Sequence, residues 1–261
     1  MEYIFEKYQG TGNDFILFDA RLRNFKMLKQ SQIRSICNRN FGIGADGIII
    51  IKDHDVFDFE MLYYNSDGLL SSMCGNGARC AVAYAYEKKI FSKETSFNAY
   101  DGAHKAYVQS NSIVKLDFKD VLKIEENKNG LLIDTGSPHL IIFNNNLEKL
   151  NIKKLGSTIR YSNEFIKDGI NVNFVQCIDK NIIKLRTYER GVENETLACG
   201  TGAVASAIAA HYKRKVKNFS KILVETLGGD LLVNFTYKSK IYNNIYLSGK
   251  TEKIFSGKIF L

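Results

Sequence analysis

The chain has 261 residues, of which 45% are apolar and 12% aromatic, and it carries a formal net charge of +8. This length permits one large domain or two of about 130 residues, and the composition is that of a soluble globular protein. The five cysteines are an odd number without framework spacing, which favours reduced thiols in the cytoplasm over a secreted disulfide scaffold.

Neither a targeting segment nor a membrane span is expected, because MEYIFEKYQGTGNDF at the start contains acids and no apolar core. No apolar run approaches the roughly 18 residues that a spanning helix requires. The basic residues are spread through the chain, apart from one cluster at Lys213, Arg214, Lys215 and Lys217. We interpret this cluster as a solvated helix end, where the helix dipole favours cations, so no nucleic-acid partner is expected. A phosphate-binding patch is the open alternative.

The first residues predict a strand, a turn and a second strand. EYIFEKYQG alternates between polar and apolar residues, and the turn GTGND precedes the apolar run FILFD, so Asn13 lies at a strand–turn junction. Residues 31–40 then have the pattern of a short helix with Ser31 as its N-cap. One face of this helix is apolar and comprises Ile33, Ile36 and Cys37.

Strands are predicted next in FGIGADGIIII, as a buried strand, and in FDFEMLYYNSDG, which ends in a turn from Asn65 to Gly68. The stretch MCGNGARCAVAYA is a Gly-rich turn that opens at Cys74 into a helix of small residues reaching about Glu87. Cys80 lies in the interior of this helix and is expected to be structural. Two or three strands follow in SFNAYDGAHKAYVQSNSIVKLDF.

The second half of the chain repeats the order of the first. LACGTGAVASAIAA places Cys199 at the position of Cys74, an offset of 199 − 74 = 125 residues. LLIDTGSPHLIIFN, KDGINVNFVQC and IIKLRTYERG match earlier segments at offsets of 124 to 127, and the last of them places Arg190 against Asn65. One such pair could arise by chance, but four in the same order indicate an internal duplication.

We therefore expect an α+β fold with two pseudo-symmetric α/β domains, each a curved, mostly antiparallel, barrel-like sheet around a central cysteine-led helix. The N-terminal domain is predicted to span residues 1–117 and the C-terminal domain residues 118–251, joined by KDVLKIEENKNG as an exposed connection. Residues 252–261 are expected to form a strand that returns to the first domain. If the two halves face each other, Cys74 and Cys199 point into one cleft from opposite sides.

The two cysteine-led turns suggest acid–base chemistry. A helix start leaves amide N–H groups without intrahelical partners and carries partial positive charge, and both effects favour a thiolate over a thiol. The glycines around Asn76 and Thr201 let these N–H groups approach a carboxylate closely. A thiolate on one face of a carbon can remove a proton while a thiol on the other face delivers one, which inverts the stereocentre.

Other uses of the two thiols are less favoured. A metal site needs clustered ligands, and His54, His104, His139 and His211 form no such cluster, so no metal is expected. The C-x-x-C spacing of a redox pair is absent from both turns, although a redox sensor remains a rival interpretation. No lysine motif for PLP and no dinucleotide fingerprint is present in the sequence. We therefore expect no cofactor, and the protein itself must stabilise the carbanion of an acidic C–H, such as that of an α-amino acid.

Several motifs resemble those of the diaminopimelate epimerases over essentially the whole chain: MCGNGAR and ETLACGTGA, with GTGNDF, GIGADG, YNSDG, GSPH, INVNFV and YERG in this order. The resemblance implies a cofactor-independent epimerase that interconverts LL- and meso-2,6-diaminopimelate for lysine and peptidoglycan synthesis. It also implies two domains that close on the substrate, and commonly a homodimer.

The same resemblance implies the site residues. Cys74 and Cys199 are the two acid–base cysteines. The backbone cradle for the reacting carboxylate comprises Gly75, Asn76, Gly200 and Thr201. The matching substrate-binding positions are Asn13, Asn65, Asn171, Glu189 and Arg190. His139 and Glu189 match polar residues beside the cysteines. This agrees with the residue chemistry, because Arg190 can bind a carboxylate bidentately and Glu189 can bind an ammonium group.

Three positions depart from the family pattern. Ser137 stands where an asparagine is usual, Gly47 stands where some members have glutamine, and ERGVENETLACG has one extra residue between Arg190 and Cys199. These departures leave the fine substrate preference open. The polar residues also have structural interpretations, since asparagines such as Asn13 and Asn65 are common in turns on backbone grounds alone.

Two related enzyme classes are the nearest alternatives. Racemases of the proline or hydroxyproline type tend to carry histidine after the first Cys-Gly and have no distal carboxylate to bind. Asn76 and Arg190 therefore favour diaminopimelate. Isomerases of the phenazine-biosynthesis type share the duplicated fold but lack the cysteine pair.

Overall fold

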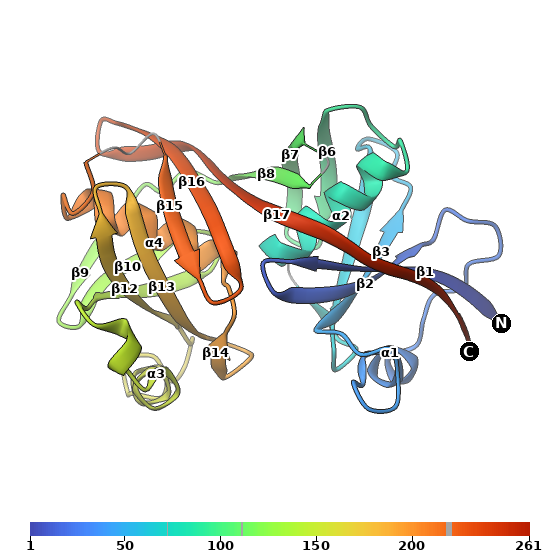
Figure 1. Cartoon of the computed structure of the whole chain (residues 1–261), viewed down its shortest axis with the longest axis horizontal. Coiled ribbons are helices and arrows are strands. Elements are labelled where there is room, and N and C mark those ends of the chain that lie inside the picture. The colour runs from blue at the N-terminus through green and yellow to red at the C-terminus, as the bar shows by residue number, and fades with distance from the viewer. Residues whose placement is uncertain (72, 111, 218–220) are drawn as a thin grey trace. The chain divides into compact units, whose positions relative to one another are not determined.

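The computed structural model of the protein describes residues 1–71, 73–110, 112–217 and 221–261 (Figure 1). The chain divides into two compact units: unit 1 is Met1–Leu116 with Gly249–Leu261, and unit 2 is Asp117–Ser248. Within the described residues, no helix is long and apolar enough to cross a membrane.

Unit 1 contains two helices, α1 (Gln30–Cys37) and α2 (Gly75–Glu87). Its strands are β1 (Glu2–Gly10), β2 (Asn13–Asp19), β3 (Gly47–Lys52), β4 (Phe59–Asn65), β5 (Leu70–Ser71), β6 (Glu94–Ala99), β7 (Gly102–Ser110), β8 (Ile113–Phe118) and the end of β17 (Ile241–Phe260). The strands pair in the order β1-β2-β3-β4-β6-β7-β8, and β17 pairs with both β8 and β1. The sheet of unit 1 therefore closes on itself, as a barrel does.

Unit 2 contains the helices α3 (Ile152–Arg160) and α4 (Gly200–Tyr212) and the short helix η1 (Leu147–Lys149). Its strands are β9 (Glu125–Asn127), β10 (Gly130–Asp134), β11 (Pro138–Phe143), β12 (Asn171–Asp179), β13 (Ile182–Glu189), β14 (Asn194–Thr196), β15 (Ile222–Thr226), β16 (Gly229–Lys238) and the start of β17. They pair in the order β9-β10-β11-β12-β13-β15-β16-β17, with β14 beside β13.

The two units share one topology, which confirms the predicted duplication and fold class. In unit 1, α1 joins the parallel pair β2 and β3, and α2 joins the parallel pair β4 and β6. In unit 2, α3 and α4 make the same crossovers between β11 and β12 and between β13 and β15. A parallel pair needs such a crossover, whereas the remaining neighbours are antiparallel and need only short turns.

The composition of α2 and α4 explains their central positions (Figure 1). Both helices have 13 residues, most of them small and buried on every side. A helix that is apolar all round is stable only when it is enclosed, and small residues let strands approach it closely. The helix α2 packs against β1, β2, β3, β4 and β7. The thiol of Cys80 is fully buried in this packing, as predicted for a structural cysteine.

The structure corrects the predicted bounds of the first helix. The helix α1 has Lys29 as its N-cap, and Ser31 lies inside the first turn. The side chain of Gln32 accepts a hydrogen bond of 2.8 Å from the Lys29 N–H, so the helix starts two residues earlier than it would with Ser31 as the N-cap. The helix ends at Cys37 because the side chain of Asn38 accepts the N–H groups of residues 40 and 41 instead.

The segment between the two halves is more structured than a plain exposed connection. Strand β9 pairs with β10, and Val121 is buried and pairs with Tyr242. The basic cluster lies at the end of α4, as predicted, with Lys213 as the C-cap. The Lys213 ammonium forms an ion pair of 2.6 Å with Glu126.

Candidate active site

Cys74 lies at the start of α2. It is the N-cap residue, with extended backbone angles of φ −90° and ψ 120°, and its side chain is half-buried. Its carbonyl oxygen accepts the first helical hydrogen bond, 2.7 Å from the Ala78 N–H. The following residues, Gly75 and Asn76, are buried. The thiol thus stands where unpaired amide N–H groups and the positive end of the helix dipole lie.

A chain of side-chain hydrogen bonds holds this turn to the neighbouring strands. The amide of Asn76 donates to Oδ1 of Asn13 at 2.6 Å, and the amide of Asn13 donates to Oδ2 of Asp46 at 2.9 Å. Oδ1 of Asn76 accepts a bond of 2.9 Å from Arg79. Two residues that sequence reasoning singled out, Asn13 and Asn76, are therefore in direct contact.

Asn65 ends β4 opposite Gly47. Its backbone holds the turn predicted after this strand, because its N–H donates to the Leu69 carbonyl and its carbonyl accepts from Gly68. The side chain of Asn65 is half-buried. A Cβ atom at Gly47 would lie 2.5 Å from the Tyr64 carbonyl oxygen, so this backbone has no room for the side chain that some family members carry there.

Cys199 occupies the same position at the start of α4. It is the N-cap, with φ −118° and ψ 113°, and is 6% exposed. Its Sγ atom lies 3.4 Å from Oγ1 of Thr201. The hydroxyl of Thr135 donates a bond of 2.9 Å to the Thr201 carbonyl and so anchors this first turn, in which Gly200 is buried. All five cysteines of the chain are described, and none is in a disulfide.

His139 lies fully buried on β11 and is held by Asn173 of β12. The Asn173 amide lies 3.0 Å from Nδ1 of His139, and an amide donor there leaves the proton of the neutral ring on Nε2. Among the described residues, Nε2 of His139 has no hydrogen-bond partner. Burial, with a contribution from the charge of Arg190, lowers the pKa of His139 to about 3. The imidazole is therefore neutral near pH 7 and offers one N–H donor.

A glycine brings Asn173 to the start of α4. A Cβ atom at Gly202 would lie 2.5 Å from Oδ1 of Asn173 and 3.3 Å from Sγ of Cys199. The carboxamide and the thiol therefore converge on one point of the helix, where only a hydrogen atom fits. Oδ1 of Asn173 also accepts a bond of 3.0 Å from Thr187. The histidine, the asparagine and the cysteine belong to one buried polar group.

A second group in unit 2 joins Ser137, Asn171 and Arg190. The Arg190 N–H donates to Oδ1 of Asn171 at 2.9 Å, and the Asn171 amide donates to the Ser137 hydroxyl at 2.9 Å. The Arg190 guanidinium donates to the Asp168 carbonyl at 2.8 Å, and it lies 3.5 Å from the Ser137 hydroxyl. Within the described residues, the exposed guanidinium hydrogen-bonds to uncharged oxygens and has no carboxylate partner, so it is placed to bind an anion.

Glu189 ends β13 and accepts a bond of 2.9 Å from the Thr196 hydroxyl. The loop with the extra residue is ordered around Glu193, which has a left-handed φ of 56°. Glu193 accepts a bond of 3.2 Å from the Tyr188 hydroxyl and pairs with Arg160 at 3.4 Å. These contacts anchor the longer loop to β13 and to the end of α3.

The structure places the predicted residues in three groups of contacts. Asn13 and Asn76 lie together in unit 1, His139 lies with the Cys199 turn, and Asn171 lies with Arg190. Sequence reasoning missed Arg79 and Asn173. Arg79 stands inside the motif MCGNGAR, and Asn173 stands inside INVNFV, so both residues were part of recognised motifs. The sequence did not reveal that their side chains are buried.

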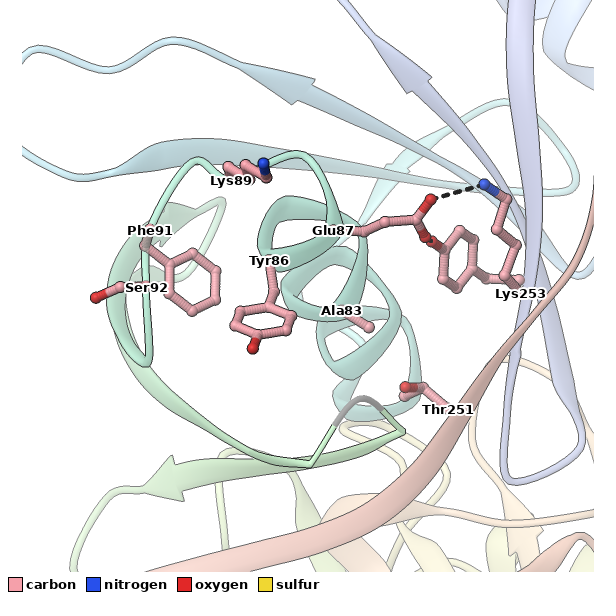
Figure 2. Close-up of a pocket in the computed structure, with 9 residues that line it drawn as sticks. Ala83, Tyr86, Glu87, Lys89, Phe91, Ser92, Thr251 and Lys253 are labelled. Carbon is pink, nitrogen blue, oxygen red and sulfur yellow. Dashed lines mark hydrogen bonds and ion pairs between the residues drawn. The ribbon is translucent and has the colours of Figure 1, made fainter.

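A separate cavity of about 860 Å³ lies at the other end of α2 (Figure 2). Its lining includes Tyr8, Tyr86, Phe91, Glu87 and Lys253. Glu87 accepts a bond of 2.7 Å from the Tyr8 hydroxyl and pairs with Lys253 at 2.8 Å. None of the predicted site residues lines this cavity. In the described part of the chain, no group of three or more His, Cys, Asp or Glu is placed to hold a metal ion.

Solved structures share the fold of the whole chain. A phenazine biosynthesis protein of the PhzF family from Bacillus anthracis matches with a TM-score of 0.72 and 16% identity, covering 100% of both chains. A hydroxyproline epimerase from Agrobacterium vitis matches with a TM-score of 0.69 and 12% identity, covering 99% of this chain and 92% of the other. The duplicated fold, with a cysteine opening each central helix, defines the class of this protein as a two-unit α+β fold.

Sequence comparison identifies the family within this class. A profile of the family described as diaminopimelate epimerase matches residues 5–117 and 131–254. A diaminopimelate epimerase of Flavobacterium psychrophilum is 45% identical over 253 residues, which cover 97% of this chain and 98% of that protein. The chain belongs to the diaminopimelate epimerase family and is an isomerase.

Proposed function

We propose that this protein interconverts LL-2,6-diaminopimelate and meso-2,6-diaminopimelate by proton transfer at one α-carbon, with Cys74 and Cys199 as the acid–base pair. One observation carries the proposal: each duplicated unit has a cysteine as the N-cap of its buried central helix. Family membership supports the same reaction. The reaction needs no cofactor, because the protein can stabilise the carbanion itself.

The proposed chemistry follows from the two helix starts. One cysteine, as a thiolate, removes the α-proton, and the other, as a thiol, donates a proton to the opposite face of the carbon. Negative charge then develops on the α-carboxylate. Amide N–H groups at Gly75 and Asn76 and at Gly200 and Thr201 would bind this carboxylate, where the helix dipoles stabilise the developing charge. Reversal of the two roles gives the reverse reaction.

The remaining site residues would hold the distal end of the substrate. Arg190 supplies a guanidinium without a carboxylate partner among the described residues, and it suits the distal carboxylate. Asn13, Asn65 and Asn171 supply amides for the carboxylate and ammonium groups, and Glu189 supplies a carboxylate for an ammonium. Neutral His139 offers an N–H donor beside the Cys199 turn.

The cellular setting belongs to the same proposal. The product would serve lysine and peptidoglycan precursor synthesis in the cytoplasm. The protein would act as a homodimer, in which domains 1–117 and 118–251 of each chain close on the substrate and the tail 252–261 belongs to the first domain. Light scattering of the purified protein tests the dimer, and a monomer at micromolar concentration would contradict it.

The test is conversion of LL-diaminopimelate to the meso form by reduced protein without added cofactor. Cys74→Ala and Cys199→Ala should each lower kcat by at least about 1,000-fold, because each removes one of two required proton-transfer groups. Cys177→Ala is the matched control, since Cys177 is a half-buried thiol of unit 2 outside the site, and it should keep normal activity. Turnover of proline but not of LL-diaminopimelate would overturn the substrate assignment.

A further inference from the structure

Arg79 is a buried cation that the proposed reaction does not use. It lies in the second turn of α2 and is fully buried. Its guanidinium donates to the hydroxyl of Thr11 at 2.5 Å, to Oδ1 of Asn76 at 2.9 Å and to the Gly75 carbonyl at 3.3 Å. Each of these acceptors is uncharged. Nε of Arg79 is buried and has no hydrogen-bond partner among the described residues.

A buried charge without a counter-charge is costly, so an anion is expected near the Arg79 guanidinium. Its hydrogen bonds to the Gly75 carbonyl and to Oδ1 of Asn76 place the guanidinium at the turn that Cys74 opens, and Cys80 follows Arg79 in the chain. Burial lowers the pKa of Arg79, and negative charge on Cys80 and on Cys74 opposes that shift. Burial also raises the pKa of Cys80 to about 12, so Cys80 is a neutral thiol near pH 7. Of these two thiols, Cys74 is the one that can be an anion.

Most other charged groups on the strands around α2 have partners of opposite charge. The ion pairs are Glu2–Lys258, Glu6 with Lys88 and Lys253, Asp14 with Lys7 and Arg39, Asp19–Arg21 and Lys52–Glu60, and His104 lies 3.2 Å from Asp101. The other titratable groups on these strands are Lys105 and the phenols of Tyr3, Tyr8, Tyr63, Tyr64 and Tyr107. Asp46, which Asn13 contacts, is paired with Arg39 at 2.7 Å.

The corresponding place in unit 2 has no cation. At the offset between the two helices, 79 + 125 = 204, the residue is Val204, which is fully buried. Asn173 and His139 lie behind the Cys199 turn, and both are neutral near pH 7. The charged and titratable groups on the strands around α4 are Asp134, His139, Cys177, Asp179, Lys184, Arg186, Tyr188, Glu189, Glu225, Asp230, Tyr237 and Lys238.

We propose that Arg79 is a positioning residue that holds Cys74 as a thiolate in the substrate-free enzyme, while Cys199 is held as the thiol. The duplicated helices are thus alike in backbone and unlike in charge. Arg79 acts through the first turn of α2, because it binds both Gly75 and Asn76 and does not reach solvent. Cys74 is therefore the base in the direction that starts from this state, and the reverse direction starts from the opposite protonation state. This inference rests on the proposed function for its catalytic meaning, but its test does not require activity.

The test measures the alkylation rate of each cysteine against pH by peptide mass spectrometry, using iodoacetamide on the reduced full-length protein. In the natural sequence, the midpoint for Cys74 should lie below that for Cys199. In Arg79→Met, the Cys74 midpoint should rise by about one pH unit or more, since a nearby opposite charge commonly shifts a pKa by that amount. Arg79→Lys, which keeps the charge, should stay close to the natural sequence.

Arg23→Met is the matched control, because it removes one exposed positive charge from the same unit. It should leave both midpoints unchanged, and Arg79→Met should leave the Cys199 midpoint unchanged. A Cys199 midpoint at or below that of Cys74 in the natural sequence would overturn the proposal, even if Arg79→Met does not fold. An unchanged Cys74 midpoint in folded Arg79→Met would make Arg79 purely structural. If the Cys74 and Cys199 midpoints behave as expected but the protein has no epimerase activity, the result would count against the proposed function alone.

Discussion

The side-chain amide of Asn173 lies 3.0 Å from Nδ1 of His139 in the buried interior of unit 2. This contact fixes the proton of the neutral imidazole on Nε2, beside the start of α4. It also explains how a histidine can be fully buried without a carboxylate partner. The ring remains neutral, so it can donate a hydrogen bond but does not bring a positive charge to Cys199.

The neutral state of His139 predicts a dependence of stability on pH. Its pKa of about 3 in the folded protein lies below the unfolded value of 6.5, so the unfolded state binds more protons between these values. The free energy of unfolding should therefore fall as pH falls, and by about 2 kcal/mol more between pH 7 and pH 5 in the natural sequence than in His139→Gln. Urea unfolding at both pH values measures this difference. Equal losses in the two proteins would show that folding does not lower the pKa of His139.

Gly202 should not tolerate a methyl group. In Gly202→Ala the new Cβ would meet Oδ1 of Asn173 at 2.5 Å, so the first turn of α4 must shift. We expect a loss of about 1–3 kcal/mol in the free energy of unfolding and a lower kcat, because Cys199 moves with the turn. Ser206→Ala in the same helix is the control, since its buried hydroxyl has no partner among the described residues and its removal should cost little. Similar stability of Gly202→Ala and the natural sequence would disprove the close approach.

Arg190 should act on substrate binding through its shape as well as its charge. Loss of a charged hydrogen-bond donor costs about 1.5–3 kcal/mol, so Arg190→Met should lower kcat/KM about 10- to 100-fold. Arg190→Lys should recover only part of this loss, because an ammonium cannot bind a carboxylate bidentately. Steady-state kinetics with LL-diaminopimelate measure both variants. Arg214→Met at the exposed end of α4 serves as the control, and an equal loss there would point to a general charge effect.

The sequence predicted the features that depend on local chemistry. The glycines around Asn76 and Thr201 and the small residues after them signalled two helices with cysteine N-caps, and the common offset revealed the duplicated topology. The prediction of Ser31 as the N-cap of α1 was wrong, because the Gln32 side chain binds the Lys29 N–H and the helix starts there. That contact depends on the conformation of one side chain, which periodicity does not encode.

Burial of polar residues was harder to predict than their presence. Arginine is almost never fully buried unless it is paired, so Arg79 would be expected at the surface. Its place inside unit 1 depends on Thr11, which is 68 residues away in the chain. The contact between His139 and Asn173 likewise depends on the pairing of β11 with β12, because the two residues are 34 positions apart in the chain. Such long-range contacts are set by the tertiary fold.

The most direct test of the two-cysteine reaction is the fate of deuterium at early times in heavy water. The reduced enzyme is incubated with LL-diaminopimelate, and the reaction is stopped before a tenth of the substrate has reacted. Substrate and product are then separated, and the deuterium content of each is measured by mass spectrometry. With two bases on opposite faces of the α-carbon, the meso product should carry one deuterium and the recovered LL substrate should carry none. Deuterium in the recovered substrate at the same early times would show that one base returns solvent protons to the face it deprotonates, and the two-cysteine account would be wrong.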